Sequence, residues 1–245
     1  MKPKHLVLAT AGLLLLSAHF SAFAWWGSDD VKGNGDVTTV EHAVSSDVDE
    51  VEIALPAQVT IDNGSGDMRI EAEKNLMPYI VVKVSGDELS VRSKRGYDLR
   101  PSKPIVIHIH LKQLEKLSAA GSGSVNVGDF SGEHLKLDMA GSGNVTMNSA
   151  QYQHLDADVA GSGSVTINSG KVDRLSLDIA GSGSLHAFGL KSRRADVDIA
   201  GSGKVQLSAS DKLSIDIAGS GNIEYIGSPE VSPRILGSGT VTRKQ

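Results

Sequence analysis

Aspartate recurs at one fixed offset in the second half of the chain, three positions before the first glycine of a repeated Gly-Ser-Gly motif. If the repeats stack as strands, equivalent side chains form a row with neighbours about 4.8 Å apart. Carboxylates at that distance repel each other by roughly 1 kcal/mol per pair even in a water-like dielectric. Hydration and hydrogen bonds to turn amides could offset this repulsion, and so could Ca²⁺, which prefers oxygen ligands. The candidate calcium row consists of Asp138, Asp158, Asp178, Asp198 and Asp216.

Acid and base catalysis is a second use that paired carboxylates could serve. Asp156 and Asp158 lie on one strand face about 7 Å apart, a separation that glycosidases use. The same spacing recurs at Asp196 and Asp198. Nothing nearby predicts the burial that would raise the pKa of one carboxyl, and the convex face of a repeat fold offers no cleft. We therefore predict no catalytic residue, with a polysaccharide-acting enzyme as the alternative.

Basic side chains occupy a second fixed offset, seven positions before the same glycine. Both offsets fall on the strand face opposite the apolar residues, so each repeat would show one acidic and one basic edge to solvent. The enzymatic alternative would combine the aspartates with an arginine of this row. The basic row consists of His134, His154, Arg174, Arg194 and Lys212.

Other polar motifs favour structural roles. His108 and His110 share a strand face and could begin a metal site, but no third ligand lies near them in the sequence. The serine of each Gly-Ser-Gly motif is a turn residue, since no His and Asp partners recur at a spacing that would activate it. The motif is not a phosphate loop either, because no helix-forming segment or Lys-Ser/Thr pair follows it. Apart from the calcium candidate, no cofactor is expected.

The Gly-Ser-Gly motif itself reveals a repeat, with spacings of 20, 20, 20, 20, 18 and 18 residues. Between the motifs, apolar residues alternate with polar ones, as in Leu175, Leu177 and Ile179, and this period of two is typical of β-strands. Glycine suits the corner because positive φ or close backbone approach excludes most other residues. The first glycines are Gly121, Gly141, Gly161, Gly181, Gly201, Gly219 and Gly237.

Two short strands per repeat cannot bury their apolar side chains alone, whereas stacked repeats bury a continuous column. We therefore predict an all-β fold in which residues 118–241 form a parallel β-solenoid with rungs of about 20 residues and Gly-Ser-Gly turns. By extension from parallel crossovers, it should be right-handed. An antiparallel meander or sandwich, in which Gly-Ser-Gly closes hairpins, is the alternative. Residues 37–117 predict less regular strands, which either continue the column or form a separate sheet, and residues 242–245 form a tail.

Residues 1–24 have the pattern of a secretory signal, with a basic start, an apolar stretch and the small-residue site Ala22-Phe23-Ala24. This pattern predicts cleavage between Ala24 and Trp25, followed by a flexible mature N-terminus, residues 25–36. No later segment is apolar enough to span a bilayer as a helix, and there is no cysteine to carry a lipid or a disulfide. We expect an exported protein of the periplasm or the cell surface.

The charge balance narrows the choice of partner. The formal net charge is −5, and it becomes −7 without the signal because two of the 24 basic residues, Lys2 and Lys4, lie in it. Nucleic acid is not expected as a partner, since phosphate binding needs clustered excess Lys and Arg. Aromatic residues make up only 4% of the chain. Any interaction should therefore be polar, multivalent or cation-dependent.

The segment EKNLMPYIVVKVSGDELSVRSK, followed by PIVIHIHLKQLEKLSAAGSGSV, resembles the head GIN domain family, formerly a domain of unknown function. The likeness covers about residues 37–241. It implies an exported β-solenoid similar to the heads of autotransporter adhesins, with no established enzymatic activity and no site residues. We expect an adhesin-like or scaffold module that binds a protein or polysaccharide of the envelope or the exterior. Self-stacking into polymers is a third possibility, which Pro229, Pro233 and the charged tail oppose.

Overall fold

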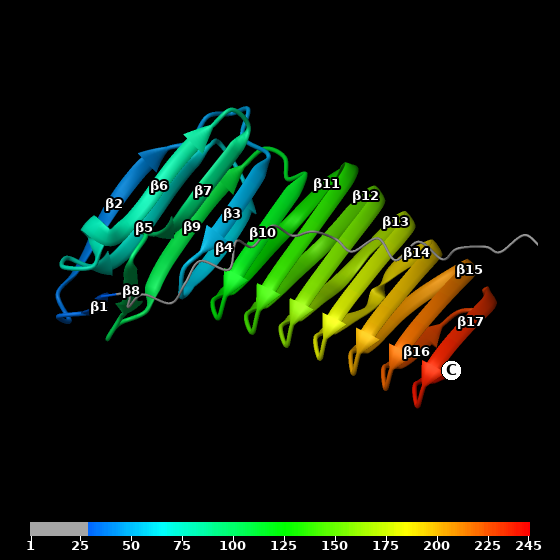
Figure 1. Cartoon of the computed structure of the whole chain (residues 1–245). Coiled ribbons are helices and arrows are strands. Elements are labelled where there is room, and N and C mark those ends of the chain that lie inside the picture. Colours follow the sequence, from blue (N-terminus) through cyan, green and yellow to red (C-terminus); the bar gives the residue numbers. More distant parts are fainter. Residues whose placement is uncertain (1–28) are drawn as a thin grey trace, which may run out of the picture.

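The computed structural model describes residues 29–245 (Figure 1). The predicted signal segment and its cleavage site between Ala24 and Trp25 lie outside this range. Within it, the chain consists of strands and one short 3₁₀ turn, without an α-helix. No helix there is long and apolar enough to cross a membrane. The predicted all-β fold is confirmed.

The strands fall into a front part and a repeat part. The front part contains β1 (Asp29–Lys32), β2 (Val37–Ala43), β3 (Glu50–Ala54), β4 (Ala57–Asn63), β5 (Asp67–Glu73), η1 (Met77–Tyr79), β6 (Ile80–Ser85), β7 (Glu88–Ser93), β8 (Tyr97–Arg100), β9 (Ile105–Leu111) and β10 (Lys116–Gly121). The repeat part contains β11 (Ser124–Gly141), β12 (Asn144–Gly161), β13 (Ser164–Gly181), β14 (Ser184–Gly201), β15 (Lys204–Gly219), β16 (Asn222–Ile226), β17 (Glu230–Gly237) and β18 (Thr240–Arg243).

The repeat part is a parallel solenoid in which each rung pairs with the next, as the adjacent ribbons in Figure 1 show. Equivalent residues of the repeat lie opposite each other, so Leu135 pairs with Leu155 and Leu155 with Leu175. The sequence predicted two short strands per repeat. The structure instead has one strand of 18 residues per rung in β11 to β14, because backbone pairing continues around the corner between the two apolar runs.

The Gly-Ser-Gly turns stack as tightly as the strands do. Gly161 has φ +114°, and a Cβ atom there would lie 2.5 Å from the carbonyl oxygen of Gly141. The amide of Ser162 donates to that same carbonyl at 2.9 Å. Glycine is therefore required twice over, for its left-handed backbone and for the close approach of the preceding rung.

The core is the column of apolar side chains inside the rungs. Leu135, Leu155, Leu175, Ala195 and Leu213 occupy one row of it, and each is at most 1% exposed. Burial of a leucine side chain stabilises the fold by roughly 1.5–3 kcal/mol. The column is filled by side chains along its whole length, so the rungs act as a packed support for the side chains that point outward.

The front part continues this column. Strand β3 pairs in parallel with β10, and β4 pairs in parallel with β11, so Leu117 lies opposite Val51 and Val125 opposite Val59. Strands β7 and β9 add one further parallel layer. Antiparallel strands then extend this layer: β6 pairs with β7, β5 pairs with β9, and β2 pairs with β5. The sequence left open whether the front part continues the column or forms a separate sheet, and these pairings show that it continues the column.

The N-terminal stretch that was expected to be flexible, residues 25–36, is in its described part built into the fold. Strand β1 pairs in parallel with β8. The amide of Asp29 donates to the Gly96 carbonyl and that of Gly33 to the Arg100 carbonyl, both at 2.9 Å. The flexibility expected for residues 25–36 stays a prediction. The sequence did not reveal strand β1, because four residues with one apolar side chain give too weak a periodic signal to be recognised.

Candidate functional site

The second half of each rung, from the basic row to the glycine, forms one continuous sheet, and its outward side is called the charged face here. In-register pairing brings the predicted aspartates together as a row on this face. The row starts beside Ser118, which lies opposite its first member, and ends beside Arg234, which lies opposite its last. The members, in order of pairing, are Asp138, Asp158, Asp178, Asp198 and Asp216.

Basic side chains neutralise both ends of the aspartate row. Lys136 Nζ lies 3.3 Å from Asp138 Oδ1 and 3.3 Å from Asp158 Oδ2. Partial burial alone would lower the pKa of Lys136, but these two carboxylates outweigh burial and raise it. At the other end, Arg234 Nη1 lies 3.2 Å from Asp216 Oδ1. These cations partly offset the repulsion that the sequence predicted.

The middle of the row is not neutralised in the same way. No ion pair of the described residues involves Asp178 or Asp198. Partial burial raises the pKa of Asp178, and the neighbouring carboxylates of Asp158 and Asp198 raise it further. Burial likewise raises the pKa of Asp198, with added repulsion from Asp216 and Asp196. The centre of the row therefore holds protons more readily than an ordinary aspartate.

The carboxylate pairs considered for catalysis each have a basic partner. Asp156 Oδ2 lies 3.1 Å from His134 Nε2, and Asp196 Oδ2 lies 3.2 Å from Arg174 Nε. The aspartates and basic residues that the sequence placed on one face thus meet across neighbouring rungs. The face that carries them is the outside of a sheet, which supports binding of an extended partner better than chemistry in an enclosed site.

The candidate metal residues lie in two places, the aspartate row and the outward face of β9. Within residues 29–245, no three His, Cys, Asp or Glu side chains are arranged to hold a metal ion. His108 and His110 share one face of β9, and His110 Nδ1 lies 3.0 Å from Asp67 Oδ2. That contact lowers the pKa of Asp67. The carboxylates of the aspartate row lie one rung apart and form a line along the solenoid. Calcium binding by this row stays a prediction.

The predicted basic row also forms in register along the charged face. His134 and His154 pair, and the row continues through Arg174 and Arg194 to Lys212. The two imidazole rings are 6.4 Å apart between centroids. The sequence did not reveal that this row lies at a corner of the solenoid, because two consecutive outward residues interrupt the alternation there.

Around that corner lie basic residues that the sequence reasoning missed. Lys171 pairs with Lys191 in register, and Arg193 lies beside Arg194 with both side chains exposed. Arg193 contacts Asp173 at 3.7 Å and Asp211 at 3.2 Å. The available signal was an offset of ten positions before the first glycine, at which lysine stands in two successive repeats.

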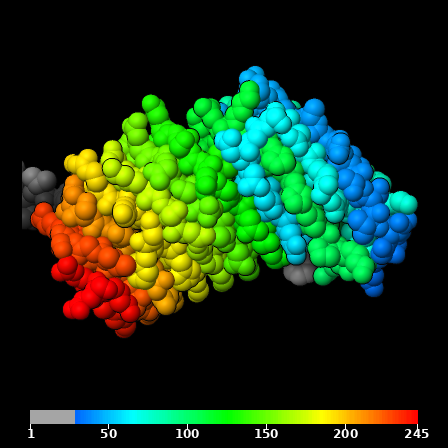
Figure 2. All heavy atoms as spheres, turned by 180° about the vertical axis from the view of Figure 1, so that it is seen from behind, coloured from blue at the N-terminus to red at the C-terminus, as the bar shows by residue number. Residues whose placement is uncertain are grey.

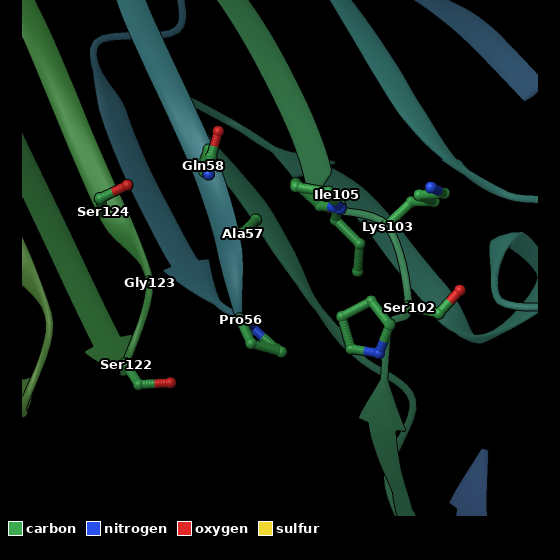
Figure 3. Close-up of a pocket in the computed structure, with 11 residues that line it drawn as sticks. Pro56, Ala57, Gln58, Ser102, Lys103, Ile105, Ser122, Gly123 and Ser124 are labelled. Carbon is green, nitrogen blue, oxygen red and sulfur yellow. The ribbon is translucent and has the colours of Figure 1, made fainter. Parts of the chain in front are cut away.

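A cavity of about 390 Å³ lies where the first Gly-Ser-Gly turn meets the front part. Figure 3 shows Ser122 and Gly123 on one side, Ser102 and Lys103 on the other, and Pro56 between them. A second cavity, of about 530 Å³, lies beside Arg100 and Pro101. Neither cavity includes a residue of the acidic or basic rows.

Comparison with known proteins gives the same architecture. The model of the family described as "Putative auto-transporter adhesin, head GIN domain" matches residues 47–229. A solved structure described as a "putative lipid binding protein" from Parabacteroides distasonis is 30% identical, with a TM-score of 0.74 over 89% of this chain and 100% of that one. A comparison with curated proteins returned no match.

Two further solved structures share the fold. A "putative adhesin" from Bacteroides fragilis is 23% identical, with a TM-score of 0.81 over 87% of this chain and 100% of that one. A "putative adhesin" from Parabacteroides merdae is also 23% identical, with a TM-score of 0.68 over 89% of this chain and 100% of that one.

Proposed function

Since this chain belongs to the head GIN domain family, we propose that it is an exported, non-enzymatic, adhesin-like module that binds a macromolecule of the cell envelope or its surroundings. One observation carries the proposal. Two rows of charged side chains run in register along a solenoid whose interior is fully packed. Such rows present many weak polar contacts at a fixed spacing, which suits multivalent binding to an extended partner.

The polysaccharide-acting enzyme is less well supported. Asp156 and Asp196, the members of the two pairs outside the aspartate row, are each held by a basic side chain 3.1 to 3.2 Å away. Asp158 also contacts Lys136. A general acid needs a raised pKa in a site that also holds the substrate, and the two cavities described lie elsewhere.

Self-stacking into polymers is also less well supported, because the last rung has a proline where its backbone faces away from the preceding rung. Lys136 donates its amide to the preceding rung, at 2.8 Å from the Glu115 oxygen, and Ser232 occupies the same place in β17. Alternate residues of a parallel strand bond to opposite sides. Pro233 therefore stands where an amide would otherwise face an incoming strand, and proline has none to offer.

Binding and export can be tested separately. Residues 25–245 would be purified and passed over immobilised envelope polysaccharides and envelope proteins, with a neutral resin as control. Saturable retention on one of these materials is expected, and retention no greater than on the neutral resin would contradict an adhesin-like role. For export, the mass of the protein made in its own cells should correspond to a chain that starts at Trp25. An intact Met1 start would contradict export by signal cleavage.

A further inference from the structure

The corner of the solenoid between β13 and β15 carries a concentration of positive charge that we call the basic ridge. Its members stand in two adjoining columns. Lys171 and Lys191 are paired in one, and Arg174, Arg194 and Lys212 are paired in the other. All of these side chains are exposed. Arg193 lies between the columns.

The ridge keeps a net positive charge after its internal ion pairs are counted. Six basic residues stand against two acidic ones in the ridge, Asp173 and Asp211, and both of these are engaged by Arg193. Arg174 is also engaged, by Asp196 of the charged face. Counting all three acids leaves an excess of three positive charges on three consecutive rungs. The whole chain has a net charge of −5, so the ridge opposes the sign of the molecule.

Four ridge residues form no ion pair within the part of the chain that the structure describes: Lys171, Lys191, Arg194 and Lys212. In-register stacking places Lys171 beside Lys191 and Arg194 beside Lys212, about one strand spacing of 4.8 Å apart at the backbone. Like charges so close repel each other. Asp211, which interacts with Arg194, and Glu230, which lies opposite Lys212 in the next rung, offset only part of this repulsion. An anionic partner would relieve it.

We propose that the basic ridge binds an acidic polysaccharide, a linear chain that carries carboxylate or sulfate groups. The proposal rests on the adhesin-like function proposed above and names the partner class and the surface. The ridge follows the solenoid axis, so successive rungs can meet successive acidic groups of an extended polymer. Arginine adds paired donors that match the two oxygens of a carboxylate or a sulfate.

The surroundings favour a soluble polymer over a membrane. Among residues 29–245, the exposed large apolar residues are Val37, Val84, Ile235 and Leu236, and none of them belongs to the ridge. An interfacial membrane surface needs apolar side chains beside its basic ones. The aspartate row on the charged face, four positions further along each rung, repels a polyanion and so keeps it at the ridge.

The test compares two triple variants with the wild-type protein, residues 25–245. The ridge variant is Lys171→Gln, Lys191→Gln, Arg194→Gln, which removes exposed cations that form no ion pair among the described residues. The control is Lys83→Gln, Arg95→Gln, Lys112→Gln, which removes the same charge from exposed positions of the front part. Thermal midpoints no lower than that of the wild type establish that both variants fold.

Binding would be measured on immobilised polygalacturonate and on heparin at about 0.15 M salt, beside neutral dextran and vesicles with an anionic phospholipid. Affinity of the wild type for one acidic polysaccharide should fall by about tenfold or more in the ridge variant, and not in the control. Equal losses of affinity in both variants would overturn the proposal that the ridge is the binding surface. Tighter binding to vesicles than to polysaccharide would overturn it as well. If wild type and ridge variant bind envelope material alike, the proposed function stands and the ridge inference fails. If the wild type binds nothing, both fall.

Discussion

A single methyl group on a turn glycine tests whether the close stacking of Gly-Ser-Gly turns is needed for the fold. The perturbation is Gly161→Ala. Gly161 has φ +114°, and the added Cβ would lie 2.5 Å from the Gly141 oxygen, closer than real Cβ contacts come. The control is Gly121→Ala, at φ +103°, where an added Cβ meets nothing within 4 Å. The two variants share the backbone strain and differ in the clash.

The expected magnitudes follow from these two terms. Backbone strain should cost about 1–3 kcal/mol in either variant. In Gly161→Ala, overpacking against the preceding turn adds about 1–3 kcal/mol. Displacement of that turn weakens the hydrogen bond from Ser162 to Gly141, worth about 0.5–1.5 kcal/mol. The difference between the variants should therefore be about 1.5–4.5 kcal/mol, or roughly 3–18 °C in thermal midpoint for a chain of this size.

The assay is thermal unfolding followed by circular dichroism, with urea unfolding as a second measure. Because a stacked repeat can unfold in parts, the midpoints should be compared directly and not converted through a two-state fit. Equal midpoints for Gly161→Ala and Gly121→Ala would refute the reasoning, since they would show that the turns separate without loss of stability.

Three further outcomes are expected. Glu73→Gln should lower the urea midpoint at neutral pH, because the Glu73 carboxylate is 0% exposed and accepts from the Ser102 amide at 2.9 Å, among other donors. Hydrogen bonding, above all from Ser102, lowers the pKa of Glu73 below 4.5. The contribution of Glu73 to stability is therefore complete above pH 4.5 and is lost as pH falls through the folded pKa. An unchanged acid transition in the variant would contradict this. Asp178→Asn should act in the opposite direction, since burial and neighbouring carboxylates raise the pKa of Asp178 above 3.8 and its charge therefore costs stability at neutral pH. The variant should be more stable than wild type by up to about 1 kcal/mol at pH 7. This gain should disappear below pH 3.8, where Asp178 is protonated in both the folded and the unfolded state. A lower midpoint of the variant at pH 7 would be the contrary result. Pro233→Val should restore an outward amide on the edge strand β17 and raise the proportion of oligomer in size-exclusion chromatography with light scattering, whereas an unchanged profile would show that the proline does not protect this end.

The repeat part was predictable from the sequence because its information is local and recurs. Leu175, Leu177 and Ile179 indicate a strand by their alternation, and the constant spacing of the motif predicts which residues pair. The aspartate row followed directly from that register. Figure 2 shows the result from behind, with successive rungs as adjoining bands from the front part to the C-terminal end.

The front cap and the basic ridge were not predictable in the same way. The antiparallel pairing of β5 with β9 joins two seven-residue strands whose sequences share no repeat. The carboxylate of Glu73 is buried only because distant loops supply its donors. At the ridge, Arg193 and Arg194 both point outward, which breaks the alternation on which face assignment depends. Tertiary contacts decide these features, and a local pattern does not contain them.

The repeats of this chain can also be compared with one another. The comparison distinguishes residues that every rung needs for the fold from residues that only some rungs carry. Leucine or a similar apolar residue, aspartate and glycine recur at their offsets in rungs β11 to β15. The offset of Lys171 and Lys191 holds Ser131 and Gln151 in the two rungs before them. A property needed by every rung should appear in every rung, whereas a binding surface needs only the rungs that its partner covers. The concentration of unpaired cations on β13 to β15 therefore fits a bounded contact, with the aspartate row as the neighbouring barrier that confines an acidic chain to it.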